Sequence, residues 1–229
     1  MTISFVGSAI DASTPFTPAE TGSPASGDFM LLFGTIATVD GTWTVPGDFT
    51  VIDQFAETAG AGDMHVFIAY KIRGADAGSG YNCSYSGTAG NTRVLLAAYR
   101  GDAGTLALDV TYVKATHYDA TLNNANAAAK PIDTATNGAM VILAQMISSN
   151  AVSAFGPPSG YTQRDAAAAA NASIYLCDKI VATAGTETPG VYTHTAAEGT
   201  QDQRQFTIAI SETSAAASKL AVLKRNRHF

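Results

Sequence analysis

Residues 27–36 read GDFMLLFGTI, and about 110 residues later residues 138–147 read GAMVILAQMI. Three further pairs of similar segments follow in the same order and at nearly the same offset. They are VPGDFT at 45–50 with PPSGYT at 157–162, HVFIAYK at 65–71 with SIYLCDK at 173–179, and NTRVLLAAYR at 91–100 with DQRQFTIAIS at 202–211. Each unit is far longer than a solenoid repeat, and two copies are too few for a solenoid. The pattern favours a duplicated set of strands folded into one β-sandwich.

Short segments rich in β-branched and aromatic residues recur along the whole chain, separated by clusters of Gly, Pro, Asp or Asn. With no amphipathic helix between them, they predict an all-β, antiparallel β-sandwich of jelly-roll or concanavalin-like type. Two alanine-rich runs, Ala125–Lys130 and Ala166–Ala170, are too short for stable helices and are expected to be loops or single turns. The predicted strands are Thr2–Val6, Phe29–Ala37, Phe49–Phe55, Met64–Arg73, Tyr81–Tyr85, Arg93–Tyr99, Leu106–Val113, Met140–Ile147, Ser173–Val181, Val191–His194 and Gln205–Ile210.

The chain is expected to form a single β-sandwich domain over residues 1–214, with pseudo-repeats at about 27–101 and 138–211. Residues 11–26 would be a polar loop that precedes the first repeat. Two side-by-side lobes are the alternative arrangement. Residues 215–229 are expected to form a basic C-terminal tail, with a strand at Lys219–Leu223.

Composition and charge exclude several classes of protein. A hydrophobic content of 46% with 14% charged residues indicates a folded chain rather than a disordered one. The last eleven residues hold four of the thirteen Lys and Arg residues, which leaves a body with a charge near −10. Such a body repels phosphate backbones, so no nucleic-acid partner is expected. The sequence has no signal peptide and no apolar stretch of about 18 residues, which predicts synthesis in the cytoplasm without membrane insertion.

The sequence offers no positive sign of catalysis or of a cofactor. The four histidines are scattered without partners at metal-ligand spacing, and no nucleophile elbow, zinc motif or phosphate-binding loop occurs. A pair of catalytic carboxylates, as in a glycosidase, needs a defined distance between the two groups. The sequence does not define this distance for pairs of acids such as Asp102 and Asp109. The two cysteines, Cys83 and Cys177, are best interpreted as buried free thiols, with a disulfide between the halves as the alternative.

Two features that recur in both halves are expected to be structural. Residues 45–49 and 157–161 each place a Pro- and Gly-containing turn directly before an aromatic residue, which would anchor the next strand in the core. Two pairs of cations also recur, Lys71 with Lys179 and Arg93 with Arg204. Ion pairs or side-chain stems at the rim of a sheet are favoured for them over ligand binding.

Aromatic residues outside the repeated core are candidates for contacts with a glycan, because exposed rings stack on the apolar faces of sugars. For Trp43, which lies among polar neighbours, the alternative is that its ring caps the edge of the sandwich. The candidates for glycan contacts are Trp43, Tyr81, Tyr112, His117 and Tyr118.

The ordered signatures resemble a family of jelly-roll-like β-sandwich virion proteins that tailed bacteriophages, prophages and gene transfer agents encode. In the first half the resemblance is carried by GDFMLLF at 27–33, DFTVI at 48–52, FIAYKI at 67–72 and VLLAAYRG at 94–101. In the second half it is carried by MVIL at 140–143, PPSGYTQR at 157–164 and FTIAI at 206–210. It extends from residue 1 to about residue 213.

The resemblance implies a non-enzymatic surface component of a phage or phage-like particle, such as a head spike, a head fibre or a tail-fibre module. Several members are lectin-like adhesins, so the expected partners are host cell-surface polysaccharide and other virion proteins, and a homo-oligomer is compatible with this role. The alternative is a purely structural decoration, tail or baseplate protein that contacts only other virion proteins. The protein would be part of the virion, made in the host cytoplasm and released by lysis. Lys224, Arg225 and Arg227 of the tail are expected to dock on an acidic neighbour.

Overall fold

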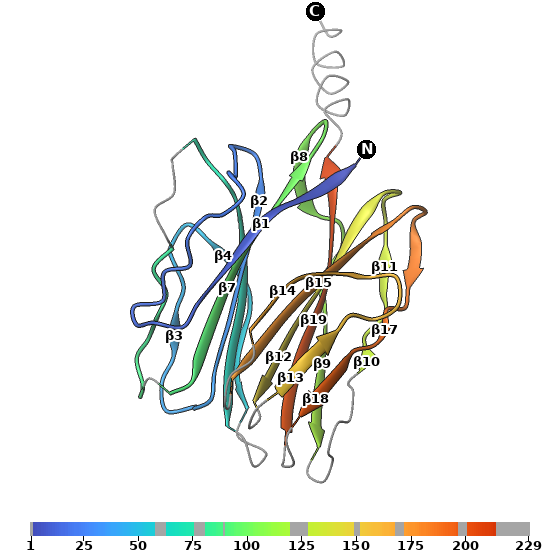
Figure 1. Ribbon diagram of the computed structural model, residues 1–229. Helices are drawn as coiled ribbons and strands as arrows, with labels where there is room; N and C mark the ends of the chain where they lie inside the picture. Colours follow the sequence, from blue (N-terminus) through green and yellow to red (C-terminus); the bar gives the residue numbers. More distant parts are fainter. Residues whose placement is uncertain are drawn as a thin grey trace, which may run out of the picture.

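The computed structural model describes residues 2–57, 63–75, 81–88, 90–119, 128–148, 152–167, 172–196 and 201–213 (Figure 1). Each half of the chain supplies one large sheet. Sheet 1 consists of β1 (Ile3–Asp11), β2 (Phe29–Ile36), β4 (Thr50–Glu57), β5 (Met64–Ile72) and β7 (Thr92–Gly101). Sheet 2 consists of β8 (Thr105–Leu108), β9 (Val113–Asp119), β12 (Ala139–Ser148), β14 (Thr162–Ala167), β15 (Ser173–Val181) and β19 (Gln201–Thr213).

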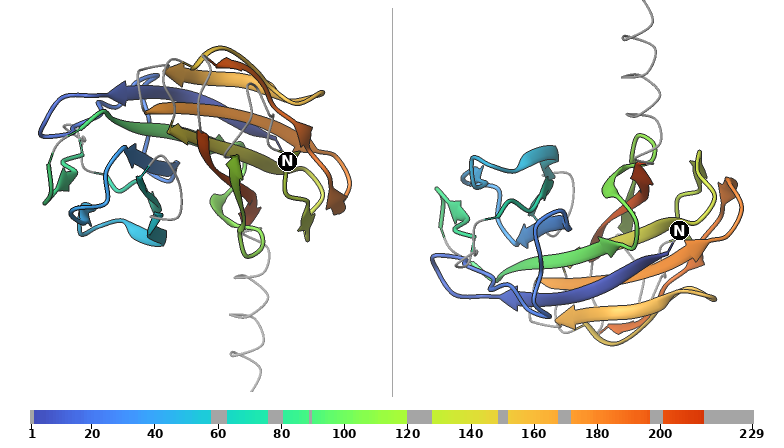
Figure 2. Two further views of the ribbon diagram at one scale, coloured as in Figure 1. Left: turned by 90° about the horizontal axis from the view of Figure 1, so that it is seen from below. Right: turned by 90° about the horizontal axis from the view of Figure 1, so that it is seen from above.

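Four short strand pairs lie outside the large sheets. They are β3 (Trp43–Thr44) with β6 (Ser84–Tyr85), β10 (Ala128–Ala129) with β17 (Gly190–Val191), β11 (Ile132–Thr134) with β16 (Gly185–Glu187), and β13 (Val152–Gly156) with β18 (Thr193–Ala196). Every described pair is antiparallel, and the two large sheets pack together as a sandwich (Figures 1 and 2). The predicted all-β fold with an antiparallel β-sandwich is therefore confirmed. No described helix is long and apolar enough to cross a membrane.

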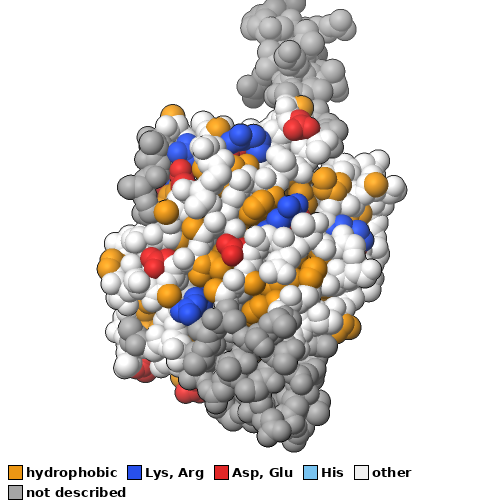
Figure 3. Space-filling view, in the orientation of Figure 1, with side chains coloured by type: hydrophobic (Ala, Val, Ile, Leu, Met, Phe, Trp, Pro, Cys, Tyr) orange, Lys and Arg blue, Asp and Glu red, His pale blue; other side chains and the backbone are white. Residues whose placement is uncertain are grey.

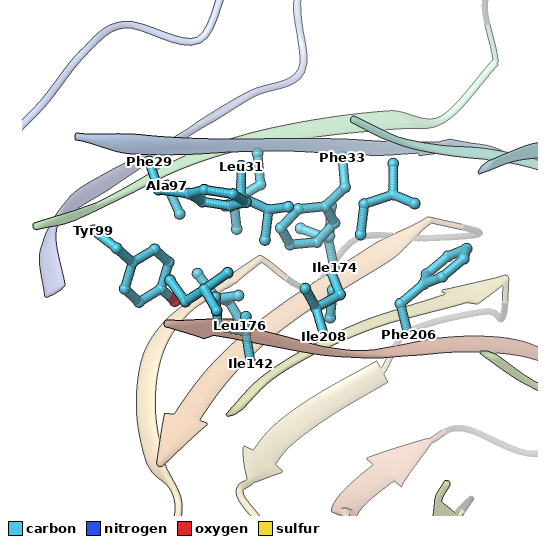
Figure 4. Packing of buried hydrophobic residues seen from close by; sticks show 14 of the residues in the cluster. Phe29, Leu31, Phe33, Ala97, Tyr99, Ile142, Ile174, Leu176, Phe206 and Ile208 are labelled. Carbon is cyan, nitrogen blue, oxygen red and sulfur yellow. The ribbon is translucent and has the colours of Figure 1, made fainter. Parts of the chain in front are cut away.

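A hydrophobic core fills the space between the sheets. Phe29, Leu31 and Phe33 alternate along β2 and point from sheet 1 toward sheet 2 (Figure 4). Ile142 on β12 and Ile208 on β19 face them, and all five side chains are fully buried. Since burial of one such side chain contributes about 1.5–3 kcal/mol, this layer is the main source of stability for the packing of the sheets.

Each large sheet is also covered on its outer face, which explains why β2 and β12 read as unbroken apolar runs. Met30 and Leu32, on the opposite face of β2, belong to a second cluster together with Trp43. Val141 on β12 belongs to a third cluster together with Tyr192. A sheet with one wet face would alternate between apolar and polar residues, whereas a sheet covered on both faces needs apolar residues throughout.

The similar segments of the two halves occupy corresponding positions in the two sheets. The order β7-β2-β5-β4 in sheet 1 corresponds to the order β19-β12-β15-β14 in sheet 2. The internal pseudo-repeat itself stays a prediction. The jelly-roll or concanavalin-like connection pattern and the domain limits at 1–214 and 215–229 also stay predictions, and residues 214–229 lie outside the described part.

The structure differs from the predicted strands in several places. β3, β10, β11, β13, β14 and β16 were not predicted, Tyr81–Tyr85 is a strand only at Ser84–Tyr85, Val191–His194 is divided between β17 and β18, and β19 is longer than Gln205–Ile210. β1 continues to Asp11, well beyond Val6, and two separate strands, β8 and β9, replace the one expected over Leu106–Val113. Of the described residues in the alanine-rich runs, Ala128–Ala129 and Ala166–Ala167 are in strands, whereas Lys130 is not. The expectation of loops or turns at these alanines was wrong, because pairing with neighbouring strands outweighs the weak helix propensity of alanine. The remaining residues of both runs lie outside the described part.

Both predicted turns have the expected effect on the residue that follows. The amide of Phe49 donates to the carbonyl of Pro46 at 3.0 Å, and that of Tyr161 donates to the carbonyl of Pro158 at 3.0 Å. Both aromatic side chains are buried. Only the second turn uses a glycine with positive φ, Gly160 at +83°.

The recurring lysines form ion pairs at the rim of the sandwich, as expected. Lys71 pairs with Asp48 at 2.6 Å, and Lys179 pairs with Glu187 at 2.8 Å. The arginines differ, because the Arg204 side chain is fully buried and its guanidinium lies 5.8 Å from the ring centroid of Phe55, whereas Arg93 is only partly buried. Arg204 is therefore a core residue rather than a rim residue.

The cysteines are free and fully buried, which confirms the interpretation as core thiols. They lie in different clusters, Cys83 on the outer face of sheet 1 and Cys177 on the outer face of sheet 2. Burial raises the pKa of the Cys83 thiol to about 12 and raises that of Cys177 as well.

Since only the thiolate reacts, both thiols are expected to react slowly with a thiol reagent at pH 8 in the native protein. The rate of modification should be on the order of a thousandfold lower than in the unfolded chain. Spectrophotometric titration with and without denaturant measures this difference. Rapid modification of one thiol without denaturant would contradict its enclosure.

Candidate functional site

The edge strand β1 of sheet 1 meets the edge strand β14 of sheet 2 at a boundary that we call the first seam (Figures 1 and 2). An open cleft lies at this seam. The hydroxyl of Ser8 on β1 donates to Oδ2 of Asp165 on β14 at 2.7 Å and joins the sheets below the cleft. The cleft has a volume of about 550 Å³, in the range of small-molecule and peptide-side-chain sites. Its lining residues are Ile3, Ser4, Phe5, Met140, Gly160, Thr162, Arg164, Asp178, Lys179 and Ile180.

A β-bulge directs Arg164 into the seam. The register of β14 against β15 shifts between Gln163 and Asp165, which leaves Arg164 as the extra residue. Its Nε donates to Oδ2 of Asp178 at 2.8 Å, and its guanidinium carbon lies 5.0 Å from the ring centroid of Phe5. The arginine thus links the two sheets through an ion pair on one side and a cation–π contact on the other.

Asp178 is a carboxylate in an enclosed position, with only 2% of its side chain exposed. Burial raises its pKa above the ordinary value, even though the hydrogen bond from Arg164 acts in the opposite direction. Tyr99, fully buried on β7, faces sheet 2 from across the core (Figure 4), and burial together with the charge of Asp178 raises its pKa as well. The pair therefore lies in a weakly solvated environment, where electrostatic interactions are strong.

Lys179 forms the other charged wall of the cleft. Its Nζ donates to Oε1 of Glu187 at 2.8 Å and lies 5.6 Å from the ring centroid of Tyr161. The hydroxyl of Tyr161 donates to the same carboxylate oxygen at 3.2 Å, and burial, with the negative charge of Glu187, raises the pKa of Tyr161. These contacts hold the lysine at the rim with a third of its side chain exposed.

The opposite side of the sandwich has a second boundary between the sheets, which we call the second seam. Its residues can be compared with those at the corresponding strand positions of the first seam. At the second seam β4 faces β9, and Asp53 accepts hydrogen bonds from Tyr112 at 3.1 Å and from Lys114 at 2.6 Å. β4 has its bulge at Ile52, which corresponds in strand position to Arg164, and Tyr70 corresponds to Asp178. Ile52 and Tyr70 both pack against the core. A charged pair in the first seam thus replaces an apolar pair in the second.

The groups that line the cleft are suited to binding an anion. The cleft presents two cations, two hydroxyl-bearing residues and the apolar side chain of Ile180, which is 42% exposed. Guanidinium and ammonium groups bind carboxylates and phosphates. Asp109, one of the acids considered for catalysis, instead accepts amide hydrogen bonds from Ala135 and Thr136 and holds a loop. No group of three potential metal-ligating side chains occurs within the ranges that the structure describes.

The expected exposure of Trp43 is wrong. Its side chain is 5% exposed, and its Nε1 donates to the carbonyl of His65 at 3.2 Å. Its ring packs between Phe16, Phe67 and Tyr85 with centroid distances of 4.9–5.6 Å. Trp43 covers the outer face of sheet 1, in line with the capping alternative, and has no free ring face for a sugar.

His65, beneath Trp43, provides a test of this buried cluster. Its side chain is 4% exposed and its Nδ1 lies 3.1 Å from the carbonyl of Gly41. Burial lowers the pKa of His65, although the contact with Gly41 opposes this effect. The unfolded chain therefore binds a proton below about pH 6.5 before the folded chain does, and the contribution of His65 to stability should decrease as the pH falls from 7 to 5. Chemical unfolding at both pH values should show a smaller decrease in the free energy of unfolding for His65→Gln than for the wild-type protein. Equal decreases would contradict the assignment of this effect to His65.

Tyr81 is also enclosed and is not available for stacking. Its side chain is 7% exposed, and Nζ of Lys71 lies 4.2 Å from its ring centroid. Its hydroxyl donates to Oε1 of Glu20 at 2.5 Å, and Arg73 donates to both oxygens of the same carboxylate at 2.8 Å. Burial alone would raise the pKa of Glu20, but the hydrogen bonds from Arg73 and Tyr81 lower it. Tyr81 thus fastens the loop over residues 11–26 to sheet 1.

The other predicted residues are not brought together with Trp43 and Tyr81. Tyr112 is partly buried in the second seam, where it contacts Phe206 and Asp53. The backbone of His117 and Tyr118 pairs with β19 opposite Gln203 and Asp202, but their side chains are outside the described part. Lys224, Arg225 and Arg227 are outside it entirely.

The residues of the cleft were missed because they come from distant parts of the chain. Phe5 and Arg164 meet only after the two sheets pack. One signal in the sequence could have indicated them: the aligned halves contain charged Arg164 and Asp178 where the first half has apolar Ile52 and Tyr70. No family model matches this chain, and no curated protein or solved structure matches it either.

Proposed function

We propose that this chain is a non-enzymatic surface component of a phage or phage-like particle, a head spike, fibre or tail-fibre module, that binds a partner through the first seam. The observation that carries this proposal is the cleft, which is open, carries both charged and apolar side chains and joins the edges of two otherwise covered sheets. Particle proteins need such a recognition surface on a stable scaffold. The partner that the geometry supports best is another particle protein, because arginine beside apolar side chains is typical of protein interfaces.

Analysis of purified particles tests this function. The chain should co-purify with particles at a fixed ratio to the major capsid protein, and deletion of its gene should leave particles that lack it but still package nucleic acid. Quantitative mass spectrometry of gradient-purified particles measures the ratio. Absence of the chain from particles that form in its presence would contradict the proposal.

Host cell-surface polysaccharide is a second candidate partner, favoured by the hydroxyl-bearing residues of the cleft. Ser4 and Thr162 lie there beside Arg164 and Lys179, and such groups bind the hydroxyl and carboxylate groups of acidic sugars. Binding of the purified protein to host cells with and without surface polysaccharide separates the candidates. Polysaccharide-dependent binding would establish an adhesin, and binding to neither cell type would leave particle proteins as the partners.

A further inference from the structure

We propose that the first seam receives an extended, acidic segment of a neighbouring protein, which adds to the free edge of β1 or β14 and places its carboxylates beside Arg164 and Lys179. The inference deepens the proposed function and rests on it in naming a particle protein as the neighbour. It follows from three observations: two unpaired strand edges, an exposed pair of cations, and one exposed apolar side chain at the rim.

The strand edges come first. β1 and β14 each end the strand order of their sheet, and no described strand pairs with the outer edge of either one. The loop at Thr21 covers part of β1, where the Thr21 hydroxyl donates to the carbonyl of Ser8 at 2.6 Å. The uncovered stretch is Ile3–Phe5, which is the part that lines the cleft. Unpaired edge amides and carbonyls are templates for an added strand, so the cleft favours an extended polypeptide over a compact ligand.

The charges indicate the chemistry of that segment. Arg164 and Lys179 have 28% and 33% of their side chains exposed, while their partners Asp178 and Glu187 have only 2% and 12%. Within these two ion pairs the cations are therefore more exposed than the acids, although the whole chain has a net charge of −6. On the face drawn in Figure 3, Lys and Arg side chains are scattered among hydrophobic ones, with single Asp and Glu side chains between them. A segment with aspartate or glutamate complements this charge.

The apolar contact indicates the spacing within the segment. Ile180 is 42% exposed at the rim of the cleft, next to Lys179 on the same strand. Neighbouring side chains on a strand point to opposite faces, so Lys179 and Ile180 lie on opposite faces of sheet 2, and an extended segment with acidic residues toward Lys179 would turn its alternate, apolar residues toward Ile180. We therefore expect the partner segment to alternate acidic and apolar residues.

A synthetic heptapeptide that alternates glutamate and valine is the probe for this site. Titration into labelled protein should shift the amide signals of Ile3–Phe5 and of Thr162–Arg164 in NMR spectra. A peptide with lysine in place of glutamate should not bind, and methylation of the peptide's backbone nitrogens should abolish binding because it removes the donors for strand pairing. No shift, or equal shifts with the lysine peptide, would overturn the proposal. So would unchanged binding of the methylated peptide.

Two exposed isoleucines at matching strand ends provide the variant and its control. Ile180→Glu places a negative charge at the rim without disturbing the core, and it should weaken binding of the acidic peptide roughly tenfold or more. Ile72→Glu makes the same change on β5, where Ile72 is 38% exposed and outside the cleft lining, and should leave binding unchanged. Equal weakening by both variants would show a general charge effect and overturn the site. Arg164→Gln is a second test within the cleft and should also weaken binding, provided that its circular dichroism spectrum is native.

The same pair of variants on particles separates the two proposals. If wild-type protein is absent from particles, the proposed function fails whatever the peptide does. If both Ile180→Glu and Ile72→Glu proteins occupy particles at the wild-type ratio, the function stands and the docking segment is refuted. Displacement of the peptide by an oligosaccharide of glucuronic acid, with a tighter affinity than the peptide itself, would assign the cleft to an acidic polysaccharide instead and overturn the inference.

Discussion

Replacement of Phe33 by alanine is expected to lower the free energy of unfolding by about 3–5 kcal/mol, the cost typical of removing a phenyl ring from a packed core. Phe33 is fully buried in the centre of β2 and pairs in register with Ile68 and Leu95 on the neighbouring strands. Its ring points into the space between the sheets near Ile174 (Figure 4). The cavity left by the ring would remove contacts from both sheets at once, because the backbone of a central strand cannot move inward to fill it.

Urea unfolding followed by circular dichroism measures the effect of Phe33→Ala. Phe33→Leu should cost less, because most of the side-chain volume is retained. Val51→Ala serves as the surface control, since Val51 is 46% exposed on the edge strand β4, and it should change stability by less than about 0.5 kcal/mol. A loss for Phe33→Ala as small as that of the control would mean that the two sheets do not share this core.

Removal of the Arg164 side chain is expected to give the second large effect. Arg164→Ala should lower the free energy of unfolding at pH 7 by about 2–4 kcal/mol, somewhat below the value for a fully buried pair because the arginine is 28% exposed. The loss has two parts, the cation–π contact with Phe5 and the stabilisation of the enclosed Asp178 carboxylate. The second part is the larger, since a carboxylate with 2% exposure would be left without its cation.

The pH dependence identifies the Asp178 contribution. Burial raises the pKa of Asp178 above its ordinary value even in the presence of Arg164, and loss of the arginine should raise it further. The folded variant then binds a proton that the unfolded chain does not bind until the pH approaches about 4. Its stability should therefore increase as the pH falls from 7 toward 5. The double variant Arg164→Ala, Asp178→Asn should lose this increase. If the free energy of unfolding of the double variant changes with pH as much as that of Arg164→Ala, the pH dependence belongs to another group.

The strand content of this protein could be predicted largely from local patterns. The runs at 27–36 and 138–147 became central strands, and the Pro-containing turns before Phe49 and Tyr161 formed with the expected hydrogen bonds. The expected loop or turn at Ala166 and Ala167 was wrong, because pairing with β15 decides the conformation there. Local patterns succeed where a residue's immediate neighbours determine its backbone, and they fail where a distant strand does.

The candidate site, in contrast to the strands, could not be predicted from local patterns. Trp43 has polar neighbours in the sequence, and only the folded chain shows that Phe16 from the preceding loop and Tyr85 from β6 enclose it. The cleft requires the edges of both sheets to meet, which no local pattern encodes. Comparison of the aligned halves could have marked Arg164 as unusual, yet its contact with Phe5 depends on the packing angle of the sheets.

The all-β class, the central strands and the two turns follow from the amino-acid sequence, because these depend on backbone preferences and on the alternation of side chains across a strand. The tertiary structure alone decided which aromatic rings are buried and which charges meet at the first seam. Burial and ion pairing depend on residues far apart in the chain, such as Ser8 and Asp165, that come within hydrogen-bonding distance only when the two sheets pack.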